Sequence, residues 1–136
     1  MKPLYKTVVY LLGAMVTPAW ASPVTTDFTV FKGSAILVIK PERVSDFEKA
    51  VHDIIGPTRK ETGNISYEAY QVVDQQGKPT NRFVFHEIWK SEKAMMVDHK
   101  ENATHMKRFF SLIGVGTDHS WVETFEVNGN TVKSLH

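Results

Sequence analysis

Residues 64–89 read NISYEAYQVVDQQGKPTNRFVFHEIW, and this stretch determines the expected fold. Apolar and polar side chains alternate over Asn64–Val73 and again over Arg82–Trp89, which is the pattern of strands with one buried face. Between the two runs, Asp74–Pro79 contains Asp, Gly and Pro, residues that favour a tight turn. The stretch therefore predicts a β-hairpin.

The segment before the hairpin predicts a strand followed by a helix. Ser34–Ile39 is a short run rich in β-branched residues, and Pro41 follows its end. From Arg43 onward, apolar residues recur at helical spacing and indicate an amphipathic helix. We expect this helix to be kinked near Gly56–Pro57 and to end at Gly63.

The segment after the hairpin predicts two short helices and a last strand. Ser91 is placed to cap the first of these helices and Asn102 the second. Ser111–His119 contains two glycines and reads as a loop, Trp121–Val127 as a strand, and residues 128–136 as a tail that frays. The resulting order is the βαββαβ plan of an α+β, ferredoxin-like domain with an antiparallel sheet.

Apolar side chains point to both faces of several predicted strands. Helices cover only one face of such a sheet, so the second face is expected to pack against another sheet, most simply in a homodimer. The pairs that alternate in this way are Val72 and Val73, Val84 and Phe85, and Ile88 and Trp89.

The first 21 residues have the layout of a secretory signal peptide. Lys2 and Lys6 precede the apolar stretch Thr7–Val16, and Ala19-Trp20-Ala21 supplies the small residues of a cleavage site. The apolar stretch is shorter than the ~20 residues that a membrane anchor needs. We therefore expect cleavage after Ala21, a periplasmic or secreted protein, and no membrane attachment afterwards. The predicted layout is a signal peptide (1–21), an N-terminal tail (22–32), a domain (33–127) and a C-terminal tail (128–136).

Charge and cysteine content exclude several classes of function. The 136-residue chain has 16 Lys and Arg against 15 Asp and Glu, and two of the lysines lie in the predicted signal peptide. This balance gives no support for a nucleic-acid partner. The chain has no Cys, which excludes disulfides, cysteine nucleophiles and thiolate-bound metals.

The chemistry is left to imidazole, carboxylate and aromatic side chains, because the sequence has no Gly-rich nucleotide loop and no nucleophile elbow. His99 and His105 flank the junction of the two short helices, where side chains can converge on a cleft. His86 and Glu87 are neighbours on a strand and must point to opposite faces. A metal site would join the first two histidines to His86 or Glu87, but the spacing matches no zinc motif. The alternative without chemistry is that the histidines bond backbone carbonyls at helix ends.

Three stretches of the chain resemble the antibiotic biosynthesis monooxygenase family of dimeric, ferredoxin-like proteins. They are Thr58–Tyr67, Phe83–Ala94 with the Glu-x-Trp motif, and His99 followed by His105–Phe109. The resemblance covers residues 33–127 and implies a dimeric α/β barrel.

Enzymes of this family oxygenate quinol or anthrone substrates without metal or flavin, so the resemblance implies no cofactor, with dioxygen as co-substrate. A base removes a proton, the substrate anion passes an electron to dioxygen, and the radicals recombine. By this resemblance, His99 is the expected base and His105 orients a substrate oxygen. Tyr67, Trp89, Glu87, His86 and Phe109 are the expected substrate contacts, Glu87 as a partner that fixes a histidine tautomer.

Two other functions stay open. One is a dimer that binds a small ligand, or serves in a stress response, without turnover. The other is an isomerase of a small carbonyl compound in which two histidines shuttle protons. Haem degradation is not expected, because the first strand lacks the Asn, and the helices the Trp, that the haem-degrading relatives use.

Overall fold

The computed structural model describes residues 28–135, so the predicted signal peptide lies outside the described residues. Its four strands form one antiparallel sheet in the order β2-β3-β1-β4, which confirms the ferredoxin-like prediction. The elements are β1 (Thr29–Ile39), η1 (Pro41–Arg43), α2 (Val44–Arg59), β2 (Asn64–Val73), β3 (Pro79–Trp89), η2 (Ala94–Asn102), α3 (Thr104–Ile113) and β4 (Val122–Lys133).

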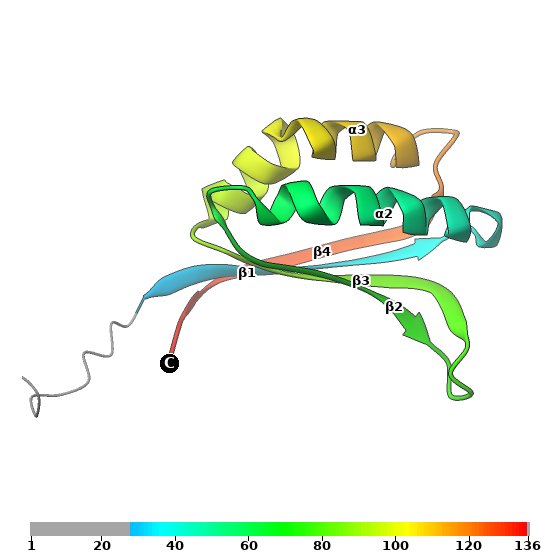
Figure 1. Ribbon diagram of the computed structural model, residues 1–136, viewed down its shortest axis with the longest axis horizontal. Helices are drawn as coiled ribbons and strands as arrows, with labels where there is room; N and C mark the ends of the chain where they lie inside the picture. Colours follow the sequence, from blue (N-terminus) through cyan, green and yellow to red (C-terminus); the bar gives the residue numbers. More distant parts are fainter. Residues whose placement is uncertain (1–27, 136) are drawn as a thin grey trace, which may run out of the picture.

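The sheet and the helices form two layers. Figure 1 shows α2 and α3 over one face of the sheet, with the end of the β2–β3 hairpin curving away from the helices. The hairpin turn is stabilised by Asp74, whose Oδ1 accepts hydrogen bonds from the backbone N–H groups of Gln76 and Lys78 at 2.9 and 2.8 Å. The predicted hairpin is confirmed, with β3 beginning at Pro79 rather than at Arg82.

Strands β1 and β4 extend further than the sequence predicted. They pair from Thr29 opposite Lys133 up to Ile39, so part of the expected N-terminal tail and most of the expected frayed C-terminal tail are in the sheet. The physical reason is that the two ends of the chain provide each other with backbone hydrogen-bond partners. The polar side chains of these segments give no sign of this pairing in the sequence. Phe31 adds to this pairing, because its buried ring lies against Gly129, where any Cβ would collide with it.

The helix boundaries also differ from the predictions. Helix α2 includes Pro57 and ends at Arg59, not at Gly63, because the next two N–H groups, of Lys60 and Glu61, bond carbonyls three residues back instead of four. Ser91 caps η2 as predicted, since its Oγ accepts the N–H of Ala94 at 3.1 Å. Asn102 does not cap α3 as predicted. The helix begins at Thr104, and its N-cap position is taken by Ala103, which has no side chain that could accept a hydrogen bond.

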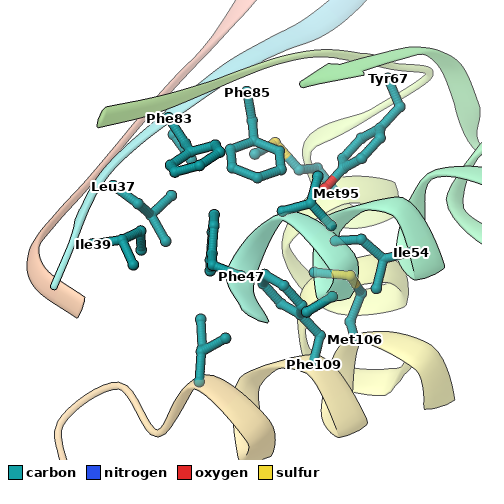
Figure 2. Packing of buried hydrophobic residues seen from close by; sticks show 14 of the residues in the cluster. Leu37, Ile39, Phe47, Ile54, Tyr67, Phe83, Phe85, Met95, Met106 and Phe109 are labelled. Carbon is teal, nitrogen blue, oxygen red and sulfur yellow. The ribbon is translucent and has the colours of Figure 1, made fainter. Parts of the chain in front are cut away.

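The core lies between the sheet and the helices. The Phe47 ring, fully buried, is 4.7 Å from that of Phe83 and 5.9 Å from that of Phe109, measured between centroids. Figure 2 shows these rings among aliphatic side chains, with Tyr67 and Met95 at one end of the same layer. Within residues 28–135, no helix is long and apolar enough to cross a membrane.

The other face of the sheet is partly apolar. Tyr70 is 51% exposed and lies beside His86 on this face, and Ile65, which is 50% exposed, lines a surface groove together with Ile88. Two-sided apolar strands are therefore present as the sequence indicated, and the homodimer expected to cover them stays a prediction.

Candidate active site

A small cavity of about 40 Å³ lies between the sheet and the helical layer. Four of its lining side chains can form hydrogen bonds or transfer protons: Tyr67 from β2, Glu87 from β3, and His99 and Lys100 from η2. The others are apolar or aromatic: Ala35, Leu37, Phe85, Met95, Met106, Phe109, Phe110, Phe125 and Val127.

Glu87 is a buried acid on the sheet side of the cavity. Its exposed fraction is 6%, and its Oε2 accepts a hydrogen bond from Trp89 Nε1 at 2.8 Å. Burial raises the pKa of Glu87 to about 7, although the bond from Trp89 and the charge of Lys100 act in the opposite direction. The carboxyl group therefore changes its protonation near neutral pH.

His99 lies opposite, on the helical side. Its Nδ1 is 2.6 Å from Oε1 of Glu61, and its ring centroid is 4.6 Å from that of Trp89. Burial lowers the pKa of His99 to about 4, so the imidazole is neutral at pH 7. A carboxylate can only accept, so an ionised Glu61 holds the ring proton on Nδ1 and leaves Nε2 as the basic nitrogen.

Glu61 links His99 to a second histidine. His105 Nε2 lies 3.0 Å from the same Oε1 atom and 3.0 Å from Oγ1 of buried Thr58. Burial raises the pKa of Glu61, while His105 opposes the shift. The Glu61 carboxylate therefore links His99 at the cavity to the partly exposed imidazole of His105.

The same three residues form the one candidate metal-ligand set found among the described residues. The donor atoms of Glu61, His99 and His105 lie within 4.8 Å of one another. The sequence had paired the two histidines with His86 or Glu87 instead, and that grouping is wrong. Glu61 was missed because it follows α2 in a turn, 38 residues before His99, where no periodicity marks it. The only available signal was its place in the Thr58–Tyr67 stretch that carried the family resemblance.

The structure brings together most, but not all, of the residues predicted for the site. Tyr67, Glu87, His99 and Phe109 line the cavity. Trp89 and His105 lie behind this wall, Trp89 in the core and His105 beside a separate surface groove. Glu87 is bonded to Trp89 and not to a histidine, contrary to the expectation that it fixes a tautomer. The carboxylate that contacts a histidine nitrogen is that of Glu61.

His86 lies apart from the others. It is exposed on the opposite face of the sheet, where its ring centroid is 6.1 Å from that of Tyr70. The predicted separation of His86 and Glu87 to opposite faces is confirmed, and the cavity is on the side of Glu87.

A ferredoxin-like sheet with a largely apolar, aromatic cavity that holds an acid and a base defines an α+β protein with a small-molecule site. The chain belongs to the antibiotic biosynthesis monooxygenase family, whose sequence model matches residues 35–111.

Individual relatives agree with this assignment. The chain is 33% identical over 75 residues to YcnE of Bacillus subtilis (strain 168), a protein named as a candidate monooxygenase, covering 55% of this chain and 73% of YcnE. The fold is similar to that of a candidate antibiotic biosynthesis monooxygenase from Nitrosomonas europaea, with a TM-score of 0.62, 21% identity, and coverage of 79% of this chain and 91% of that one. A conserved protein of Methanosarcina mazei matches with a TM-score of 0.59 and 27% identity over 76% and 92% of the two chains.

Proposed function

We propose that the protein is an exported, cofactor-independent monooxygenase of a quinol-like aromatic compound, acting as a homodimer in the periplasm or outside the cell. The observation that carries the proposal is the pair of buried His99 and partly buried Glu61, 2.6 Å apart, with His99 at the wall of an aromatic cavity. A neutral imidazole whose Nδ1 proton is held by Glu61 has its Nε2 lone pair free to accept a proton from a phenol. Family membership and the monooxygenase name of a relative support the reaction class.

In this proposal His99 Nε2 takes the phenolic proton, and the carboxylate of Glu61 stabilises the imidazolium that forms. The electron-rich phenolate then gives one electron to dioxygen, and the superoxide and the phenoxyl radical combine at a ring carbon into a peroxide anion. Cleavage of the O–O bond releases water, which receives the proton held by His99. The balance for a hydroquinone is one quinol and one dioxygen giving one hydroxyquinone and one water.

The other cavity residues have supporting roles in the proposal. Glu87, with a pKa of about 7, accepts or donates a hydrogen bond to a second substrate oxygen. Tyr67 stays protonated, because burial raises its pKa well above the ordinary value, and Phe109 contacts the substrate ring. His105 acts through Glu61 and does not contact the substrate. This arrangement gives less support to an isomerase that needs two histidines at the substrate.

Oxygen consumption by the chain from residue 22 onward, with hydroquinol substrates, tests the proposal. His99→Gln is expected to lower the rate at least tenfold, because a general base contributes about 10²–10⁴-fold. The control is His52→Gln, an exposed histidine of α2, which should leave the rate unchanged. Equal rates for wild type and His99→Gln would overturn the assignment of the base. Thermal stabilisation by a quinol without product would instead favour the binding protein without turnover.

A further inference from the structure

The cavity is too small for the substrate by itself. Its volume is about 40 Å³, whereas sites that enclose small organic ligands have volumes of about 300–1,000 Å³. An aromatic ring that reaches His99 must therefore extend out of the cavity, or the wall must open.

A surface groove of about 350 Å³ lies beside the cavity. The two spaces share three lining side chains: Lys100, Phe110 and Phe125. The groove is otherwise bordered by Met96, Glu101 and Val115. Lys100 Nζ lies 5.9 Å from the Phe125 ring centroid, and a partly exposed contact of this kind contributes only about 0.5–1 kcal/mol. Moving the Lys100 side chain off the Phe125 ring would therefore open the wall between groove and cavity at small cost.

The joined space has a positive charge where the cavity meets the groove, and proton-accepting groups in the cavity. Among the residues that line either space, Lys100 is the single lysine or arginine. It forms no ion pair within residues 28–135. Its charge is close enough to Glu87 to oppose the rise in the pKa of that carboxyl. Glu101 also borders the groove, but its side chain is exposed to water, which screens its charge.

We propose that the groove and the cavity form one binding site for a hydroxyaryl compound with an anionic substituent, which binds with its phenol at His99 and Glu87 and its anionic group at Lys100. Only the phenol end rests on the proposed function; the anionic end rests on Lys100 and the shared walls. A carboxylate bound by this ammonium group would replace the weak contact with Phe125 by a charge-assisted hydrogen bond.

Calorimetric titration with two probes tests the proposal without turnover. The probes are 6-hydroxy-2-naphthoate, which has both groups, and 2-naphthol, which lacks the anion. We expect wild-type protein to bind the naphthoate at least tenfold more tightly than the naphthol. Lys100→Met should bring the two dissociation constants within about twofold of each other, and Lys100→Arg should restore the preference.

Lys107→Met is the matched control, because this lysine is exposed on α3 and borders neither space. It should keep the tenfold preference. Thermal unfolding of each variant in the absence of probe shows whether the fold is intact. A wild type that binds both probes equally, a Lys100→Met variant that keeps the preference, or an equal loss in Lys107→Met would each overturn the proposal.

The two proposals fail in different ways. Tight, Lys100-dependent binding of the naphthoate without any oxygen consumption would contradict the monooxygenase and leave the anion site standing. Oxygenation of neutral quinols by a protein that does not prefer the naphthoate would contradict the anion site and leave the monooxygenase standing.

Discussion

Replacing Glu87 by Gln should change how the free energy of unfolding depends on pH. Glu87 is buried beside the cavity with a pKa raised by burial from 4.5 to about 7. Glutamine has the same shape, and its side-chain oxygen can still accept the hydrogen bond from Trp89 Nε1. The substitution therefore removes the titration while keeping the packing.

The sign and size of the effect follow from proton linkage. Between pH 4.5 and about 7 the unfolded chain has lost the Glu87 proton and the folded chain keeps it, so the native state binds more protons. The stabilisation is complete below pH 4.5 and is lost as the pH rises through 7. At about 1.4 kcal/mol per pH unit, wild type should lose about 3 kcal/mol relative to Glu87→Gln across this interval.

His99 gives the opposite dependence and is present in both proteins. Burial lowers the pKa of His99 from 6.5 to about 4, so its contribution grows as the pH rises through this range. The difference between wild type and Glu87→Gln cancels the part due to His99 and isolates Glu87.

The assay is urea unfolding of both proteins at half-unit steps from pH 4 to 8.5. The control is Glu92→Gln, an exposed acid just after β3, whose curve should parallel that of wild type. If the free-energy difference between wild type and Glu87→Gln stays constant within about 0.5 kcal/mol over this range, the burial of Glu87 does not have the electrostatic effect described above.

Other perturbations test the core, the histidine pair, the sheet edge and the absence of a metal. Phe47→Ala should lower the free energy of unfolding by about 3–5 kcal/mol in urea, and a loss under 1 kcal/mol would contradict its central place in the core. Glu61→Ala should cost about 1–3 kcal/mol, because it leaves the Nδ1–H of buried His99 without an acceptor; the same urea titration would refute this if the variant were as stable as wild type. Deleting residues 130–136 should lower the melting temperature in calorimetry, since it removes the partners of Thr29–Lys32, and an unchanged melting temperature would mean that the pairing adds nothing. Dialysis against EDTA should leave oxygen consumption unchanged, whereas loss that zinc or iron reverses would favour a metal at Glu61, His99 and His105.

The fold could be predicted from the sequence because its pattern is local. The alternation over Asn64–Val73 and the turn after it depend only on neighbouring residues, and the structure reproduces them. The ends of β1 and β4 depend on each other across almost the whole chain, and polar residues such as Asn128 gave no sign of that pairing.

The site could be predicted only in part, because some of its residues are set by local pattern and others by contacts between distant segments. His99 and Glu87 could be placed on the correct elements, and strand geometry alone put His86 on the other face. Glu61 could not be found, because its role comes from the turn that ends α2 and brings it against η2. Lys100 was not singled out either, since a lysine in a polar helical stretch has no meaning until a cavity is seen beside it.

The measurement that tests the monooxygenase most directly is oxygen-isotope incorporation. Protein from residue 22 onward is supplied with a hydroquinol under ¹⁸O₂ in metal-free buffer, and the product is analysed by mass spectrometry. A monooxygenase acting through His99 predicts one ¹⁸O atom per product molecule and at least tenfold less product with His99→Gln. A product formed without ¹⁸O, or labelled equally fast by the variant, would contradict the proposed function.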